Sequence, residues 1–227
     1  YNPRSQITLR MLTTQDEPVD ENFFRGRLTD AWEYRKRLCD TQSCRVVYSE
    51  SDFLPGLVVD KFGDVLAMQT LSLGMDQRKD MLARLLCEIT GATGVYERND
   101  VPVRRHEGLE MQTVELFSRL GLASAWPGEV PDRVEMVENG ILYLVDVKNG
   151  QKTGFFLDQK QNRAAIAPLC PGARVLDCFC HNGSFALNAA KYGAQSVLGV
   201  DISEEALEVA RENAARARAS SRPVPPG

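Results

Sequence analysis

The feature that most constrains the fold of this chain is a run of alternating elements in its last third. Apolar periodicity predicts a strand at 174–178 and then a helix at 185–192, which Gly193 ends. A second strand follows at 196–201, and a second helix, capped by Ser203, begins at 204. Strand–loop–helix–strand–helix is how a doubly wound, α/β nucleotide-binding domain begins. From Arg216 to Gly227 the sequence has no core pattern and is expected to be a tail.

The preceding region, 45–147, predicts an α+β domain of paired strands around a helix. Val46–Tyr48, then 56–68 with a reversal at Phe62-Gly63-Asp64, indicate strands, and 76–90 has helical periodicity followed by Gly91. Asn139-Gly140 between two apolar runs is a strong hairpin signal.

Near the start, the alternation over Ile7–Leu12 predicts a strand, and apolar spacing over 23–38 predicts a helix. This helix carries a basic run that is open to two interpretations, an RNA contact or a solvated face. Interleaved acidic residues favour the solvated face. The run consists of Arg25, Arg27, Arg35, Lys36 and Arg37.

The loop after the first strand of the α/β region predicts the chemistry. Ligands of such folds sit beyond the carboxyl ends of the strands, and Gly183 suits close approach of a ligand to the main chain. Asp201, at the end of the second strand, suits the two hydroxyls of a ribose. Cys178 and Cys180 stand where a dinucleotide fingerprint has glycine, and no P-loop occurs. A cofactor with ribose but no phosphate, S-adenosylmethionine, is therefore favoured.

Composition limits the partners and the compartment. The net charge of −4 at pH 7 means that any RNA contact must be local, because the chain has no basic surplus. Six irregularly spaced cysteines favour free thiols and a cytoplasmic protein, and no apolar run is long enough for a membrane helix. The sequence does not begin with Met, so we expect it to be part of a longer or processed protein.

Five stretches carry a family resemblance: 54–60, Tyr96-Glu97-Arg98, 105–109, Gly150–Arg163 and 175–185. They resemble the bacterial large-subunit ribosomal RNA cytosine-C5 methyltransferases, which place a PUA domain before an α+β domain and a class I methyltransferase domain. The resemblance implies four parts, with 1–15 as the last strand of a PUA domain and 16–44 as a linker helix. The central domain would be 45–147, and 148–227 the first half of the methyltransferase domain.

The resemblance also implies a cofactor cradle for S-adenosylmethionine. One segment would line its methionine end, with Arg163 on the carboxylate, and a second would form the loop under the amino acid and sulfonium. Asp201 would hold the ribose beside Ser203. The implied residues are Phe155, Asp158, Gln159 and Arg163, then Asp177, Phe179 and Gly183, then Asp201 and Ser203.

The sequence departs from the family in its second half. The Asp-Pro-Pro motif and the cysteine that attacks cytosine do not occur, so no catalytic residue is assigned. The resemblance implies an enzyme acting on ribosomal RNA, with a homodimer as an open expectation. The alternative is that the chain as given is an inactive cofactor- or RNA-binding fragment. Only two strands of its α/β sheet are evident. We therefore expect the backbone amides of 165–227 to be less protected from hydrogen exchange than those of 45–147.

Several residues have plainer interpretations. Cys178, Cys180 and His181 are too few for a structural zinc site, so no metal is predicted. Cys178 is expected to face the core rather than to act as a nucleophile. Arg98, Arg104 and Arg105 suit either RNA contacts or ion pairs between domains, and Phe155 and Phe156 suit either a core or a ligand.

Overall fold

The computed structural model describes residues 1–116 and 130–220. The chain divides into two compact units, each described below by itself. The first comprises 1–134 and 145–155, and the second 135–144 and 156–227. The limits of these units differ from those of the domains expected from the sequence. The tip of one hairpin, 135–144, belongs to the second unit, and the second division falls between Phe155 and Phe156, inside the motif at 150–163.

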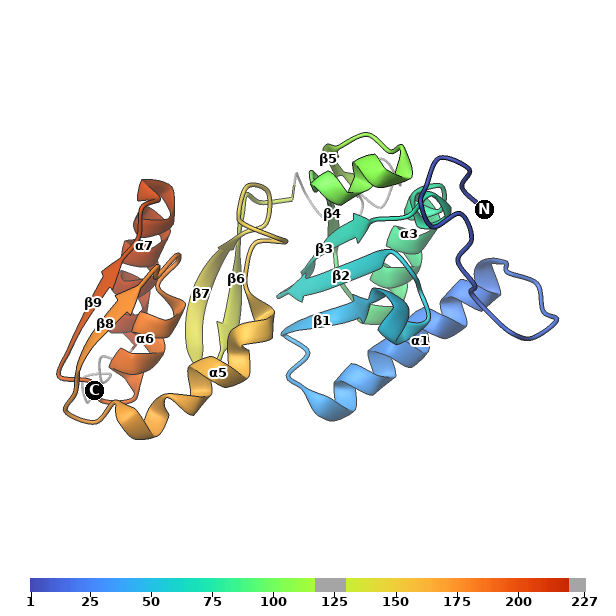
Figure 1. Cartoon of the computed structure of the whole chain (residues 1–227). Coiled ribbons are helices and arrows are strands. Elements are labelled where there is room, and N and C mark those ends of the chain that lie inside the picture. Colours follow the sequence, from blue (N-terminus) through green and yellow to red (C-terminus); the bar gives the residue numbers. More distant parts are fainter. Residues whose placement is uncertain (117–129, 221–227) are drawn as a thin grey trace. The chain divides into compact units, whose positions relative to one another are not determined.

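The first unit is built on a five-stranded sheet in sequence order (Figure 1). Its strands are β1 (Ser43–Tyr48), β2 (Leu57–Phe62), β3 (Val65–Thr70), β4 (Gly94–Asn99) and β5 (Gln112–Glu115). Neighbouring strands run antiparallel except β3 and β4, which are parallel. The predicted strands and the reversal at Phe62-Gly63-Asp64 are confirmed.

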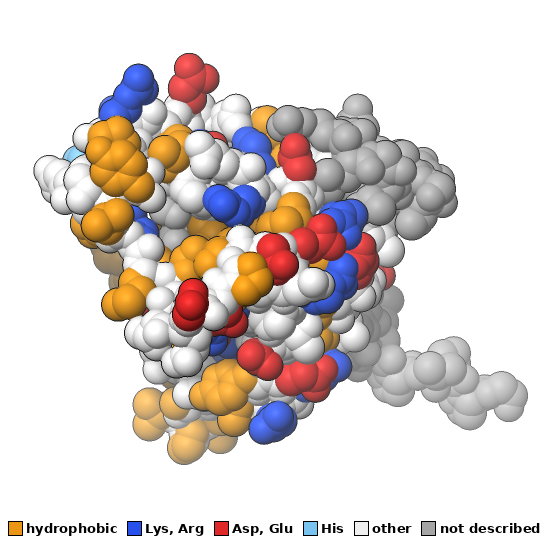
Figure 2. Space-filling view, turned by 90° about the vertical axis from the view of Figure 1, so that its right-hand side faces the viewer, with side chains coloured by type: hydrophobic (Ala, Val, Ile, Leu, Met, Phe, Trp, Pro, Cys, Tyr) orange, Lys and Arg blue, Asp and Glu red, His pale blue; other side chains and the backbone are white. Residues whose placement is uncertain are grey.

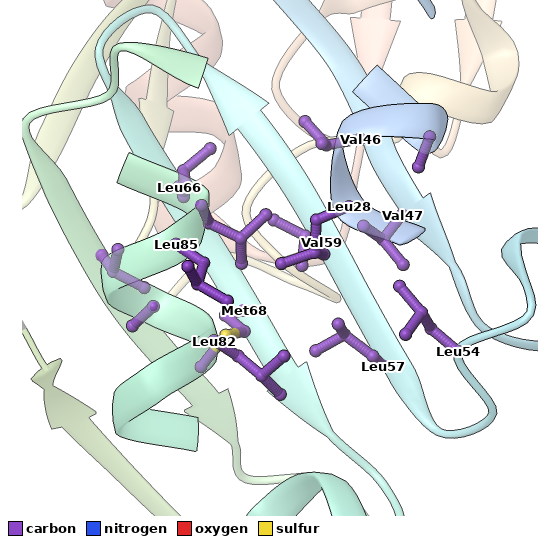
Figure 3. Packing of buried hydrophobic residues seen from close by; sticks show 14 of the residues in the cluster. Leu28, Val46, Val47, Leu54, Leu57, Val59, Leu66, Met68, Leu82 and Leu85 are labelled. Atoms are coloured by element: carbon purple, nitrogen blue, oxygen red, sulfur yellow. The ribbon is translucent and has the colours of Figure 1, made fainter. Parts of the chain in front are cut away.

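Helices α1 (Glu21–Leu38) and α3 (Lys79–Thr90) pack against each other and against the sheet. Leu28 of α1 and Leu82 and Leu85 of α3 meet Val59 and Met68 of the sheet in the core (Figure 3). Phe24, Ala31 and Trp32 are also buried, so α1 is part of this core rather than a linker. The helix expected over 76–90 is α3, which begins three residues later, at Lys79; the short helix α2 (Leu73–Asp76) precedes it and is separated from it by Gln77 and Arg78.

The expectation of a strand over Ile7–Leu12 is wrong, since none of the first twenty residues is in a strand. A strand needs a partner for its backbone, and this segment is held by side chains instead. Ser5 Oγ donates to Glu107 Oε1 at 2.5 Å, and Asn2 Nδ2 donates to the Glu107 carbonyl at 2.9 Å. Glu107 lies at the end of the 3₁₀ helix η2 (Pro102–Glu107); another, η1 (Ser49–Asp52), follows β1.

Two arginines that the sequence offered as RNA or interdomain contacts are internal to the first unit. Arg98 is 3% exposed and donates to the carbonyls of Val147 and Gly150. Arg104, 1% exposed, donates to the carbonyls of Thr70 and Glu110. Both guanidinium groups therefore serve the packing of this unit, whereas Arg105 is exposed.

The predicted hairpin at Asn139-Gly140 is confirmed. Strands β6 (Arg133–Glu138) and β7 (Ile141–Asp146) flank the two residues, which have φ of 51° and 69°. Two consecutive positive φ angles are the geometry of the turn that matches the twist of a hairpin, and Asn-Gly adopts it readily.

In the second unit, β8 (Arg174–Cys178) and β9 (Ser196–Val200) form a parallel pair, with α6 (Ser184–Lys191) and α7 (Glu204–Ser220). The predicted strand–loop–helix–strand–helix order is confirmed. Before it lie the short helices η4 (Leu157–Gln159), α5 (Lys160–Ala165) and η5 (Ala167–Leu169). The expected tail from Arg216 is helical as far as Ser220, because α7 continues through it.

One face of this two-stranded sheet lies open. Leu176 is 59% exposed and Leu198 64%, whereas the alternate residues of both strands are half-buried. Cys178 lies on the open side of β8 and is exposed, so the expectation that it faces the core is wrong. Helix α6 contacts both strands, but the residues on the open face have no second layer to cover them among the described residues.

Candidate cofactor site

The β8–α6 loop and the end of β9 bring two carboxylates together. Asp177 and Cys178 pair with Gly199 and Val200, so Asp177 and Asp201 come from the same end of adjacent parallel strands. Asp177 Oδ2 accepts the Ala186 N–H at 2.9 Å, which fixes the carboxylate at the start of α6. Burial raises the pKa of Asp177, the Ala186 N–H opposes this, and the charge of Asp201 adds to the increase.

The Asp201 carboxylate connects two loops. Its Oδ2 accepts the His181 N–H at 2.8 Å, and its Oδ1 accepts the Ser203 N–H at 3.0 Å. These backbone donors, Ser203 first, lower the pKa of Asp201, so the group is an ionised acceptor near neutral pH. Ser203 Oγ accepts the Ala206 N–H at 3.2 Å, which confirms Ser203 as the cap of α7.

The loop from Phe179 to Gly183 alternates through positive φ angles: 61° at Phe179, 50° at His181 and 76° at Gly183. A Cβ at Gly183 would lie 3.1 Å from the Cβ of Ala210 on α7. The backbone conformation therefore favours glycine here, and a methyl group at this position would need Ala210 to move by a few tenths of an ångström. Phe179 is 88% exposed.

His181 is a site residue that the sequence did not single out for the cofactor. Its Nδ1 is buried and has no hydrogen-bond partner among the described residues. Its ring meets that of Phe156 edge-on, with centroids 5.3 Å apart. Buried nitrogens without a hydrogen-bond partner are uncommon in proteins, which makes His181 a candidate contact for a ligand.

The residues of the 155–163 motif have separate surroundings. Phe155 is buried in the first unit, 2% exposed, whereas Phe156 contacts His181 in the second. Asp158 is exposed; its Oδ2 accepts from Gln159 Nε2 at 3.3 Å, and Gln159 Oε1 accepts from Asn162 at 2.9 Å. The Asp158 and Gln159 side chains thus form local contacts.

Arg163 makes its bidentate pair with a protein carboxylate. Nε and Nη2 donate to Glu138 Oε1 and Oε2 at 2.6 and 2.9 Å, and Arg163 is 1% and Glu138 0% exposed. Nη2 also donates to the Phe156 carbonyl at 2.9 Å. The family resemblance assigns this bidentate interaction of Arg163 to the cofactor's carboxylate. In the structure, the same interaction joins β6 to α5 and to the 155–163 motif.

These contacts form a continuous series within the second unit. Arg163 bonds Phe156, Phe156 packs on His181, and the His181 N–H bonds Asp201, whose charge acts on Asp177. Gly183 and Ser203 belong to the same two loops. Of the predicted cradle, the structure therefore groups Asp177, Phe179, Gly183, Asp201 and Ser203, with Arg163 joined through Phe156. Phe155 is placed in the other unit.

Two buried asparagines also escaped the sequence analysis. Asn188 of α6 donates to Tyr143 Oη at 2.9 Å and to the Ser184 carbonyl at 2.8 Å. Asn213 of α7 accepts the Leu144 N–H at 2.8 Å. Their only sequence signal is an amide within an Ala-rich helix, which an exposed position explains equally well.

The residues present fit a cationic nucleoside. Two neighbouring carboxylates favour a ligand that carries ammonium and sulfonium charge. Backbone N–H groups of Ser203 and His181, with a smaller contribution from Ile202, use part of the acceptor capacity of Asp201, and the remainder can accept a ribose hydroxyl. The unpartnered Nδ1 of His181 offers a further polar atom in the same loop.

Within 1–116 and 130–220, no group of three or more His, Cys, Asp or Glu side chains is placed to hold a metal ion. In the same residues, no helix is long and apolar enough to span a bilayer.

Comparison with known proteins identifies the relatives of this sequence. Residues 111–220 match the family described as S-adenosylmethionine-dependent methyltransferase. The chain is 41% identical over 217 residues to the "Ribosomal RNA large subunit methyltransferase I" of Pseudoalteromonas atlantica, covering 94% of this chain and 52% of that protein. It is also 41% identical to the protein of the same name from Aeromonas hydrophila, covering 94% and 53%. The chain thus spans about half the length of these curated relatives.

Solved structures agree on the fold. A putative methyltransferase from Streptococcus mutans superposes with a TM-score of 0.73 at 21% identity, covering 92% of this chain and 52% of that one. SMU.776, a putative methyltransferase complexed with SAH, gives 0.74 at 20% identity, covering 92% and 51%. The fold is that of a Rossmann-like methyltransferase. Residues 111–220 of this chain match the sequence pattern of the S-adenosylmethionine-dependent methyltransferases.

Proposed function

We propose that the protein to which this chain belongs transfers a methyl group from S-adenosylmethionine to carbon 5 of a cytosine in large-subunit ribosomal RNA. The observation that carries the proposal is the pair of carboxylates, Asp177 and Asp201, at one end of β8 and β9. The names of the relatives support the RNA substrate. The cytosine and its carbon 5 come from the family resemblance of the motifs at 150–163 and 175–185.

In this proposal Asp201 accepts both ribose hydroxyls and Asp177 faces the cationic amino-acid end of the cofactor. Bound S-adenosylmethionine supplies an electrophilic methyl group on a sulfonium. Phe179, His181 and Gly183 shape the loop beneath it, and Ser203 holds Asp201 in place through its N–H. Asp158 and Gln159 line the methionine end. Arg163 acts as a positioning residue, because its bonds to Glu138 and Phe156 set the packing of His181.

Methyl transfer to carbon 5 of cytosine needs a thiolate that adds to carbon 6, because this addition makes carbon 5 nucleophilic. In the family, the second half of the methyltransferase domain carries the attacking cysteine and an Asp-Pro-Pro motif, and neither occurs in the 227 residues. For the chain as given, we therefore propose binding of cofactor and RNA without methyl transfer. Labelled S-adenosylmethionine and large-subunit ribosomal RNA test this directly. Incorporation by the 227-residue chain would contradict its inactivity, and failure of a full-length form would contradict the enzyme assignment.

The ribose contact has its own test, calorimetric titration of the chain with S-adenosylhomocysteine, adenosine and 2′-deoxyadenosine. We expect Asp201→Ala to weaken S-adenosylhomocysteine binding by about 10- to 100-fold, the loss typical of a hydrogen bond to a charged group. The wild type should prefer adenosine to 2′-deoxyadenosine, and Asp201→Ala should lose that preference. Glu208→Ala, at an exposed position of α7, is the matched control.

If Asp201 only connects the two loops, the variant will weaken both nucleosides equally and the preference will remain. That result would reject the ribose assignment while leaving the fold intact.

We further propose a cytoplasmic protein, consistent with six free cysteines in a reducing compartment. A homodimer stays a prediction, which light scattering of the full-length form tests.

A further inference from the structure

Three exposed aromatic rings on the first unit each lie beside an arginine. The guanidinium carbon of Arg27 is 5.1 Å from the Phe53 ring centroid, that of Arg35 is 5.4 Å from Tyr34, and that of Arg45 is 5.0 Å from Tyr48. The rings are 63%, 56% and 51% exposed, respectively for Phe53, Tyr34 and Tyr48. We call these three arginines and three rings the aromatic–arginine patch.

The patch is one connected surface made by α1, β1 and η1. Arg35 Nε donates to the Arg45 carbonyl at 3.0 Å, and Tyr48 N–H donates to Asp52 at 2.6 Å. Arg35 Nη2 bonds the same Asp52 at 2.8 Å. A pocket of about 390 Å³ opens within it, lined by Arg27, Asp30, Tyr34, Arg35, Asp52 and Phe53.

Phe53 is held in an unfavourable backbone conformation. It ends η1 with φ of 58° and ψ of 28°, the left-handed region that glycine or asparagine adopts at little cost. A bulky residue there is an outlier that usually has a reason beyond folding. Its ring does not supply one, because it is 63% exposed rather than packed in the core.

Charge in the patch is largely neutralised. Asp52 pairs with Arg35 and Asp60 pairs with Arg45, whereas Arg27 has no carboxylate partner among the described residues. Figure 2 shows one face of the molecule, on which basic and acidic side chains lie close to one another and to hydrophobic ones. The exposed rings, together with one cation that has no carboxylate partner among the described residues, suit a ligand with flat faces and an anionic group.

We propose that the aromatic–arginine patch binds single-stranded RNA by stacking unpaired bases on Phe53 and Tyr34, with Arg27 beside a phosphate. Aromatic rings and guanidinium planes are the stacking surfaces used for single strands. A base-paired helix does not offer its base faces, so the patch selects unpaired nucleotides. The inference rests on the proposed function, since it assigns that function's RNA substrate a contact.

The test is fluorescence anisotropy of the 227-residue chain with a labelled ten-nucleotide single-stranded RNA and with the same RNA as a duplex. Phe53→Gly removes the ring and relieves the left-handed strain, so its melting temperature should equal or exceed that of the wild type. We expect it to weaken single-strand binding about 5- to 100-fold, as loss of one stacked base does. Phe53→Trp should retain binding. Leu169→Ala, which trims an exposed apolar side chain of the second unit, is the control.

Wild-type binding to the duplex that matches binding to the single strand would overturn the proposal, as would a Phe53→Gly variant that binds as tightly as the wild type. A wild type without saturable binding of either RNA would overturn it as well. Titration with S-adenosylhomocysteine separates this from the proposed function. If the chain binds S-adenosylhomocysteine but Phe53→Gly does not change RNA binding, only the proposal for the aromatic–arginine patch is rejected. If Phe53→Gly weakens RNA binding but the chain does not bind S-adenosylhomocysteine, only the proposed cofactor site is rejected.

Discussion

Arg163 Nε lies 2.6 Å from Glu138 Oε1, and both side chains are shielded from solvent. The pair joins the end of β6 to α5 across 25 positions of sequence. Through the Phe156 carbonyl it also fixes the residue that packs on His181. A motif that the family resemblance assigns to ligand binding thus has an internal structural partner, and the site depends on it indirectly.

Removing one member of this pair should destabilise the second unit. Breaking a buried ion pair leaves the other charge without compensation, at a cost of about 3–5 kcal/mol. We expect that loss for Arg163→Met in urea denaturation, and little rescue by Arg163→Lys, because an ammonium cannot reproduce the two parallel bonds.

The control is Arg216→Met, which breaks an exposed pair with Glu135 and should cost about 1 kcal/mol or less. Equal losses for the two methionine variants would contradict the buried role of Arg163.

The sequence predicted correctly those features that depend on residues close together along the chain. The Asn139-Gly140 turn, the cap at Ser203 and the order of β8, α6, β9 and α7 are of this kind. The strand predicted over 7–12 is wrong because alternating apolar residues indicate one apolar face but do not provide a partner strand. The exposure of Cys178 depends on what covers the sheet, which no local pattern contains.

The candidate site divides along the same line. Asp177, Gly183 and Asp201 follow from strand ends and a loop, so the sequence located them. The unpartnered nitrogen of His181 and the partner of Arg163 are three-dimensional facts. Glu138 sits in an alternating strand, where an acidic residue is ordinarily exposed, and nothing in its neighbours predicts full burial.

The open face of β8 and β9 should make the second unit the less protected one. Leu176, Leu198 and Val200 are all substantially exposed, whereas every residue of β2 and β3 is buried. We expect backbone amides of 174–200 to exchange faster than those of 57–70 by native-state hydrogen exchange. Uniform protection of the two segments would argue against an unsupported sheet.

The anchor of the N-terminal segment should respond to acid. Burial alone raises the pKa of Glu107, but hydrogen bonds from Arg10, Ser5 and Asn2 bring it below its ordinary value. A carboxyl with a lowered pKa stabilises the folded state fully above its unfolded pKa, about 4.3, and loses this as pH falls through the folded value. We expect Glu107→Gln to be less stable than the wild type at pH 6 by chemical denaturation, and the gap to shrink by pH 3.

A gap that is unchanged between pH 6 and 3 would show that the Glu107 charge is not what holds the segment.

Cysteine reactivity should follow burial. Burial, followed by the neighbouring Cys39, raises the pKa of Cys44 to about 12, and burial raises the pKa of Cys87 to about 11. Since the thiolate is the reactive form, both should be alkylated slowly at pH 8, and exposed Cys39 and Cys178 rapidly. Peptide mass spectrometry after timed iodoacetamide treatment measures this, with Cys178→Ser to assign one fast site. Rapid labelling of Cys44 in the folded protein would contradict its packing.

Gly183 and Gly91 allow backbone strain to be separated from steric conflict. Both have positive φ, 76° and 72°, but a Cβ at Gly91 meets nothing within 4 Å whereas one at Gly183 lies 3.1 Å from Ala210. Gly91→Ala should therefore cost about 1 kcal/mol from conformation alone, and Gly183→Ala about 1–3 kcal/mol more, because α7 must shift. Thermal unfolding of each variant measures the difference. Equal destabilisation would mean that α6 and α7 tolerate a methyl group between them, and that Gly183 is needed only for its backbone angle.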